Sequence, residues 1–214
     1  MSTLVLHSIA MSPYGWTAAL AAAEKGVDCE IAPIPEAGPE RLKLHPFGKM
    51  PVLRHGDVEM FESKAIATYL DKVFPAPFVL PSDPKLLALT EQWVSLVNTL
   101  IDHTIIRTYL FAYVAPGTPD GSPNRAAIDA VMPALNLQVA VLDRAVAPTG
   151  HLVGDSFTLA DINLMPLLHR LKIPPEGAAT LAAAKNLSRY YAGHAERPSF
   201  VRTEPPAGAP RRAA

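Results

Sequence analysis

The chain has 214 residues, 49% of them hydrophobic, which is enough for one large domain or two small ones with a sizeable core. Nineteen Lys and Arg against 20 Asp and Glu give a net charge of −1, which argues against nucleic acid or an anionic membrane as the main partner. The single cysteine, Cys29, excludes an intrachain disulfide. With no signal peptide at the start and no apolar run near the roughly 18 residues of a membrane span, we expect a soluble cytoplasmic protein.

The first third of the chain predicts alternating strands and helices. Short β-type runs are expected at 3–7, 28–32, 51–54 and 58–61, and helical segments at 17–25, 40–44 and 64–73. Gly26 ends the first helix, and a turn over 55–57 joins the last two strands. The order βαβ, then ββα, predicts a mixed four-stranded sheet with helices on its faces, a pattern that resembles a thioredoxin-like domain.

The rest of the chain predicts an all-helical domain. A proline-rich stretch marks a linker before an apolar stripe that runs from Leu89 to Leu100. Further helices are expected over about 124–146, from a Thr158–Asp161 capping box to about 171 with a bend at Pro166, and over about 178–193. The predicted domains are therefore 1–75, α/β, and 84–203, all-α, with a linker over 76–83 and a loose tail over 204–214.

One segment combines a turn, a proline and a short strand. An X-Pro bond is the only peptide bond that adopts cis cheaply, at about 0.5–1 kcal/mol. A cis bond before Pro51 would turn the N–H and C=O of Met50 towards a ligand. Further along, Ser63 is placed to cap a helix, whose N-terminus carries roughly +0.5 charge and suits a carboxylate. The backbone of Met50 could pair with an extended peptide, and the helix N-terminus at Ser63 could bind an anion. Together these two features predict a site for a small acidic peptide.

Three strings carry a resemblance to a known family: HPFGKMPVL at 45–53, FESKAIATYL at 61–70 and HLVGDSFTLADI at 151–162. They resemble the cytosolic glutathione transferases, over about 3–201, and the pattern is closest to the phi class. The resemblance implies a cis Pro51, pairing of Met50 with the cysteinyl part of glutathione, and γ-glutamyl binding by Glu62 and Ser63. Lys49 would reach the glycyl carboxylate. The family's His-Lys pair in the second helix is absent, and Arg41 or Lys43 could take its place.

The turn after the first strand reads Ser12-Pro13-Tyr14-Gly15 and is similar to the Cys-Pro-Tyr-Cys of glutaredoxins without both cysteines. Dithiol redox chemistry is therefore excluded at this turn. A hydroxyl donor and a helix N-terminus can supply the roughly 1.4 kcal/mol that lowers a thiol pKa by one unit. Ser12, where the serine-type classes keep their catalytic serine, is the first choice; Tyr14 is the rival donor. Alternatively, Ser12 is only a helix N-cap.

The resemblance implies a glutathione transferase that conjugates glutathione, its co-substrate, to small hydrophobic electrophiles in detoxification. The expected electrophile pocket is lined by Met11, Tyr14, Arg107, Tyr109, Leu110 and Tyr113. We expect a homodimer without metal, nucleic acid or membrane partners, since the seven histidines show no metal-ligand spacing. Two alternatives stay open: a binding module of the same fold without catalysis, and a glutathione-dependent isomerase or peroxidase.

Overall fold

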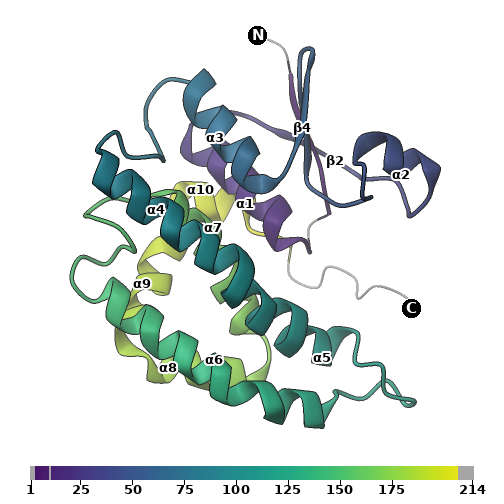
Figure 1. Cartoon of the computed structure of the whole chain (residues 1–214), viewed down its shortest axis with the longest axis vertical. Helices are drawn as coiled ribbons and strands as arrows, with labels where there is room; N and C mark the ends of the chain where they lie inside the picture. Colours follow the sequence, from purple (N-terminus) through teal and green to yellow (C-terminus); the bar gives the residue numbers. More distant parts are fainter. Residues whose placement is uncertain (1–2, 10, 207–214) are drawn as a thin grey trace. The chain divides into compact units, whose positions relative to one another are not determined.

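The computed structural model describes residues 3–9 and 11–206 and divides the chain into two compact units (Figure 1). The first unit contains the chain up to Leu80 and returns from Arg197, and the second contains Pro81–Glu196. The predicted tail over 204–214 lies mostly outside the described residues.

The first unit is built on a sheet of four strands in the order β2-β1-β3-β4. The strands are β1 (Leu4–His7), β2 (Glu30–Ala32), β3 (Val52–His55) and β4 (Val58–Phe61). β1 pairs in parallel with β2 and antiparallel with β3, which pairs antiparallel with β4. The predicted mixed sheet of a thioredoxin-like domain is confirmed.

The helices of this unit are α1 (Pro13–Glu24), α2 (Pro39–Leu44), α3 (Ser63–Val73) and α10 (Pro198–Thr203). α1 begins at Pro13 rather than at Thr17, because proline suits the first helical position and Ser12 caps it. α10 differs from the prediction that placed 198–203 in the helical domain. It packs in the first unit because Phe200 is buried there against Trp16, with 4.8 Å between the ring centroids.

The predicted linker over 76–83 begins inside the first unit, because Val79 and Leu80 are buried there. Asp71 of α3 holds this stretch: its Oδ1 accepts from the N–H of Val79 at 2.7 Å. The same oxygen lies 3.5 Å from Nζ of Lys25, and the side chains of Asp71 and Lys25 are both fully buried. The segment after α3 is therefore fixed by a polar contact and by apolar burial.

The second unit is all-helical. Its helices are α4 (Pro84–Leu96), the π-helices η1 (Val97–Ile101) and η2 (His103–Leu110), α5 (Phe111–Val114), α6 (Arg125–Val146), α7 (Leu159–Leu171), α8 (Pro175–Ala183) and α9 (Lys185–Ala195). The π-helical geometry was not predicted. The last predicted helix, over about 178–193, is two helices, because Ala184 leaves the helical conformation and Asp143 caps a new start by accepting from the N–H groups of Asn186 and Leu187.

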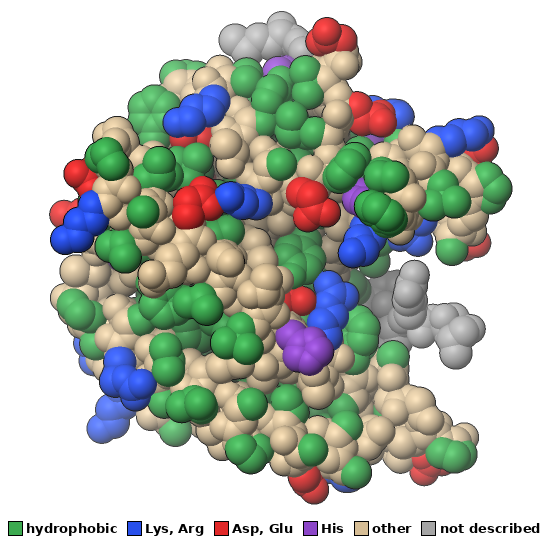
Figure 2. Space-filling view, viewed as in Figure 1, with side chains coloured by type: hydrophobic (Ala, Val, Ile, Leu, Met, Phe, Trp, Pro, Cys, Tyr) green, Lys and Arg blue, Asp and Glu red, His purple; other side chains and the backbone are tan. Residues whose placement is uncertain are grey.

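α6 presents an apolar side chain row to solvent. Leu137 is 65% exposed and Val141 39% exposed. By length and composition α6 is the one helix among the described residues that is long and apolar enough to cross a membrane, and 22% of its apolar stretch is buried. Figure 2 shows apolar side chains over the part of the surface where α6 lies in Figure 1.

The core of the second unit surrounds α7, whose side chains are almost all buried. The predicted capping box is confirmed: the N–H and hydroxyl of Thr158 donate to Asp161 Oδ2, at 2.8 and 3.1 Å. Asp161 Oδ1 accepts from the N–H of Leu152 and from the hydroxyl of Tyr190, both at 2.9 Å. This fully buried carboxylate therefore joins three parts of the unit.

We expect Asp161→Asn to lower the free energy of unfolding by about 2–3 kcal/mol, because an amide NH₂ would face N–H and O–H donors and leave them unpaired. Urea unfolding, with Asp155→Asn on the exposed surface as the control, measures the difference. Equal stability of the two variants would contradict a structural role for the buried carboxylate.

Candidate active site

Ser12 stands at the start of α1, where the chain leaves the sheet. It is the N-cap residue, and its Oγ accepts from the N–H of Gly15 at 3.1 Å. This bond uses an acceptor lone pair of the hydroxyl and leaves the proton for another partner. The cap and the donor role are therefore compatible, and the two readings of Ser12 do not compete.

Gly15 allows β1 and α1 to approach each other closely next to Ser12. A Cβ atom at Gly15 would lie 1.8 Å from Oγ and 2.9 Å from Cβ of Ser8, and 3.3 Å from Cβ of Ser12. Rotation of the Ser8 hydroxyl would not relieve the contact with Cβ, and the buried backbone of Ser8 is held by its N–H, which donates to the carbonyl of Ala32 at 3.0 Å. Sequence reasoning missed this contact; the only signal was a glycine in the first turn of a helix, where it is unfavourable.

The segment predicted to bind a peptide backbone lies just before β3. The Met50–Pro51 bond is cis, as predicted. Sheet pairing of this strand begins at Val52, which pairs with His7 and Phe61, so Met50 lies outside the ladder. Lys49 is exposed beside it, whereas Arg41 is buried beneath the same loop, with Cδ 3.7 Å from the position of a Cβ on Gly48.

Glu62 and Ser63 form the start of α3. Glu62 has φ 72° and is the only non-glycine residue with positive φ in the described part of the chain. The predicted cap at Ser63 is wrong: Glu62 is the N-cap and Ser63 the first helical residue, because the carbonyl of Glu62 already accepts from the N–H of Ile66 at 2.9 Å. The first-turn N–H groups have no partner within the helix, as at any helix N-terminus, and this is the feature that the predicted anion site requires. Backbone strain of this kind costs about 1–3 kcal/mol and tends to occur at functional sites.

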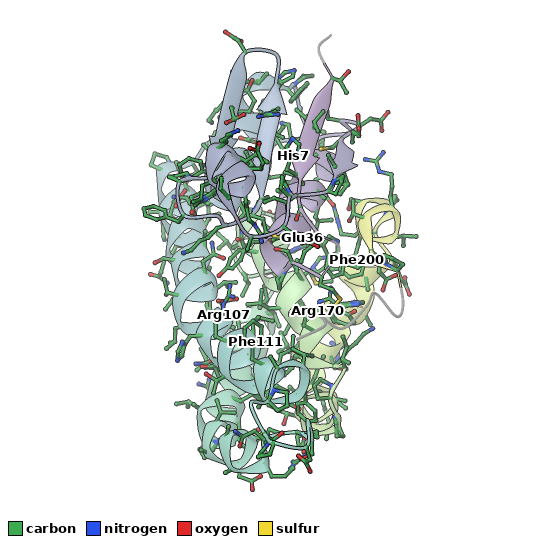
Figure 3. All side chains as sticks on the ribbon, turned by 90° about the vertical axis from the view of Figure 1, so that its right-hand side faces the viewer. His7, Glu36, Arg107, Phe111, Arg170 and Phe200 are labelled. Carbon is green, nitrogen blue, oxygen red and sulfur yellow. The ribbon has the colours of Figure 1, made fainter. Side chains whose placement is uncertain are left out.

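The residues predicted to contact an electrophile divide between the units. Met11 and Tyr14, both partly exposed, flank Ser12 in the first unit. In the second unit, Nε of Arg107 pairs with Asp102 at 3.0 Å, and Leu110 is only 7% exposed (Figure 3 labels Arg107). The alternative role of Arg107, an ion pair with Asp102, is therefore present.

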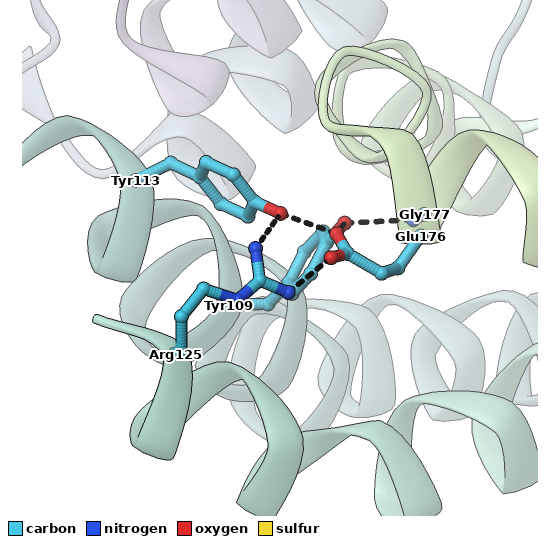
Figure 4. A network of polar contacts seen from close by, with 5 residues as sticks. All are labelled: Tyr109, Tyr113, Arg125, Glu176 and Gly177. Atoms are coloured by element: carbon cyan, nitrogen blue, oxygen red, sulfur yellow. Dashed lines mark hydrogen bonds and ion pairs between the residues drawn. The ribbon is translucent and has the colours of Figure 1, made fainter. Parts of the chain in front are cut away.

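Two tyrosines join a polar network around Glu176 (Figure 4). Tyr109 is fully buried, which corrects its expected place in a pocket wall; its hydroxyl donates to Glu176 at 3.1 Å and accepts from the N–H of Gly177 at 2.7 Å. The hydroxyl of Tyr113 also donates to Glu176, and Arg125 contacts both. The network ties the start of α8 to η2, α5 and α6.

This network predicts acid sensitivity. Desolvation raises the pKa of Glu176, but hydrogen bonds from Tyr113 and Arg125 outweigh it and lower the pKa from 4.5 to about 2. Since the folded-state pKa is depressed, the stabilisation is complete above about pH 4.5 and is lost as pH falls towards 2. We expect Glu176→Gln to lower the free energy of unfolding by about 1 kcal/mol at pH 7 and by almost nothing near pH 2. Urea unfolding at both pH values measures the difference. A difference that does not change with pH would contradict this role.

The single cysteine and possible metal ligands are the other candidate reactive groups. Burial raises the pKa of the Cys29 thiol to about 11, with a smaller contribution from Glu30, so this thiol stays protonated at neutral pH. In the described part of the chain, no three His, Cys, Asp or Glu side chains gather in a group that could hold a metal ion.

Comparison with known proteins covers almost the whole chain. Residues 6–78 match the family profile "Glutathione S-transferase, N-terminal domain" and residues 101–198 match "Glutathione S-transferase, C-terminal domain". "Glutathione S-transferase 3" of Zea mays is 30% identical, over 95% of this chain and 94% of that protein. "Elongation factor 1-gamma" of Prunus avium is 34% identical, over 74% of this chain but 38% of that protein.

The solved structures agree with these family matches. Glutathione S-transferase I from maize, in complex with the glutathione conjugate of atrazine, superposes with a TM-score of 0.85 at 26% identity, over 95% of this chain and 97% of that one. The resemblance read from the three strings, including the phi-class pattern, is confirmed. The chain belongs to the glutathione S-transferase family.

Proposed function

We propose that this protein conjugates the thiolate of glutathione to small hydrophobic electrophiles. The observation that carries the proposal is the arrangement in the first unit: a capping serine hydroxyl at the start of α1, a cis Met50–Pro51 bond, and the strained Glu62 before α3. Family membership supports the reaction, as does the relative that was solved with a glutathione conjugate.

The peptide would bind along the edge before β3 and the start of α3. Met50 would pair backbone to backbone with the cysteinyl part, and Pro51 would hold that backbone in place. The carboxylate of Glu62 would bind the ammonium of the γ-glutamyl group, while Ser63 and the free N–H groups of α3 would bind its carboxylate. Lys49, exposed next to Met50, would reach the glycyl carboxylate.

The chemical step needs a thiolate, since the free thiol has a pKa of about 8.5 and is mostly protonated at neutral pH. Ser12 would donate its hydroxyl proton in a hydrogen bond to the sulfur, and the partial positive charge of the α1 N-terminus would add to the effect. The thiol proton leaves to solvent. The sulfur lone pair then forms the bond to an electrophilic carbon, and in a substitution the leaving group departs with its electron pair.

Met11 and Tyr14 are the better candidates for contact with the electrophile, because they flank Ser12 in the chain. Arg107, Leu110 and Tyr113 remain proposed contacts, although each already has a role within the second unit. An apolar surface with few polar groups would suit aryl or alkyl compounds. We propose a role in detoxification on this basis.

We further propose a cytoplasmic homodimer. The support is the exposed apolar row on α6, with Leu137 at 65% and Val141 at 39% exposure, in a chain whose single cysteine fits a reducing compartment. Sedimentation equilibrium measures the mass directly. A monomer at micromolar concentration would contradict the dimer without affecting the proposed reaction.

The test of the reaction is the ultraviolet absorbance of thiolate in the protein–glutathione complex, titrated across pH, together with conjugation of a chlorodinitrobenzene. A bound thiol pKa well below 8.5, with loss of free glutathione during turnover, is expected. No binding at millimolar glutathione would favour a binding module. Turnover without net loss of glutathione would favour an isomerase. Loss of glutathione that requires a hydroperoxide would favour a peroxidase.

Glu62→Gly separates binding from folding. Glycine adopts φ 72° without strain. The free energy of unfolding of the variant should therefore equal that of the natural protein or exceed it by up to about 1 kcal/mol. Loss of a charged hydrogen-bonding partner should raise KM for glutathione about 10-fold or more and leave kcat nearly unchanged. Steady-state kinetics and urea unfolding measure both. An unchanged KM would remove Glu62 from the proposed site.

A further inference from the structure

The last helix of the chain lies against the helix that carries Ser12. The chain leaves the first unit at Leu80 and returns to it at Arg197, and α10 then packs on α1. Phe200, labelled in Figure 3, is 2% exposed, and Trp16 of α1 is 2% exposed as well. A segment about 190 residues beyond the predicted catalytic turn thus forms part of its support.

α10 holds α1 at two points. Near the start of α1, the Trp16 ring lies 4.8 Å from that of Phe200, and its Nε1–H donates to Oγ1 of Thr203 at 3.0 Å. At its last residue, Glu24 accepts two parallel bonds from Arg197, Nε at 2.8 Å and Nη2 at 2.7 Å, and a third bond from Ser199. A bidentate carboxylate–guanidinium pair is directional.

The two points fix both the position and the tilt of α1. Trp16 and Glu24 are about 12 Å apart along the helix axis. The first point is one turn from the active hydroxyl, because the N–H of Trp16 donates to the carbonyl of Ser12 at 3.0 Å. A shift of Trp16 therefore moves Ser12. The residues proposed to hold the peptide, Met50 and Glu62, come from other elements.

We infer that α10 is a positioning element for the hydroxyl of Ser12: through Trp16 and Glu24 it sets where the donor stands relative to the sulfur of bound glutathione. The inference rests on the proposed function. It separates two parts of catalysis: α10 acts on stabilisation of the thiolate, whereas the peptide would be bound by Met50, before β3, and by Glu62 and Ser63, at the start of α3. A misplacement of about 1 Å in such a group can cost 100-fold in rate.

The variant that tests this is Phe200→Ala, with Phe200→Leu as the conservative partner and Leu181→Ala, in α8 of the second unit, as a control for lost stability. We expect Phe200→Ala to raise the pKa of the bound thiol by about one unit, which lowers the thiolate fraction, and with it kcat, by up to about tenfold at neutral pH, and to keep KM for glutathione within about twofold. Phe200→Leu should restore most of the rate. The control should keep the thiol pKa of the natural protein.

A Phe200→Ala variant that loses stability as Leu181→Ala does, yet keeps the thiol pKa, overturns the inference. If Phe200→Ala does not fold, Glu24→Gln tests the second point. Glutamine has nearly the size of glutamate but weakens the bidentate pair with Arg197, so the pKa of the bound thiol should rise. An unchanged pKa overturns the inference. A natural protein that does not lower the thiol pKa at all overturns the proposed function, and this inference with it. A lowered pKa that responds to Ser12→Ala but to neither Phe200→Ala nor Glu24→Gln overturns this inference alone.

Discussion

Replacing Ser12 with alanine is expected to lower kcat about 100-fold and to return the pKa of the bound thiol towards 8.5, while glutathione still binds. The hydroxyl is the proposed donor to the thiolate, and its loss leaves only the potential of the α1 N-terminus. Ultraviolet titration of the complex and steady-state kinetics measure the two effects. The structure adds a second consequence: Ser12 also accepts from the N–H of Gly15, so alanine should cost about 1 kcal/mol of stability.

Two further substitutions separate the cap from the donor. Ser12→Thr keeps a hydroxyl and a capping oxygen, so it should keep most of the stability and a large part of the activity. Ser12→Asp caps the helix well but brings a negative charge and no donor, so the protein should be as stable as the natural one and nearly inactive. Full turnover in Ser12→Ala with a lowered thiol pKa would move the donor role to Tyr14.

The sequence predicted the parts of the site that depend on local geometry. A proline between a turn and a strand, a serine before a Pro-containing helix start and a charged residue before α3 each depend on neighbours within a few residues. The cis bond before Pro51 was implied by the resemblance of this local string, and the order of the predicted elements was enough to expect a mixed four-stranded sheet. The capping box at Thr158 and Asp161 is local in the same way.

What could not be predicted depends on contacts between distant residues. The placement of α10 follows from Phe200 meeting Trp16, and no periodicity in 198–203 signals that meeting. The exact cap of α3 was missed because the unusual φ of Glu62 is imposed by the surrounding fold, which a side chain pattern does not record. The π-helices η1 and η2 were missed because the apolar stripe alone does not distinguish a wider turn from an α-helix.

Gly15 is the position where such a distant contact has the largest expected effect. Gly15→Ala places a Cβ 1.8 Å from Oγ of Ser8, so the first turn of α1 or the end of β1 must move. Overpacking of this kind typically costs about 1–3 kcal/mol. Because Gly15 also donates the N–H that orients Ser12, the displacement should lower kcat about 100-fold. Urea unfolding and kinetics on the purified variant measure the two losses.

The cause can be isolated by removing the partner of the clash. Ser8→Gly deletes the two nearest atoms that a Cβ at Gly15 would meet; the third nearest, Cβ of Ser12 at 3.3 Å, remains. The double variant Gly15→Ala with Ser8→Gly should therefore be more active than Gly15→Ala alone, with a coupling energy above about 1 kcal/mol in a double-mutant cycle. Ser8→Gly by itself is the matched control for lost burial and added chain entropy. Additive losses would mean that Gly15 acts through backbone freedom, and that the close approach of β1 to α1 does not set the position of Ser12.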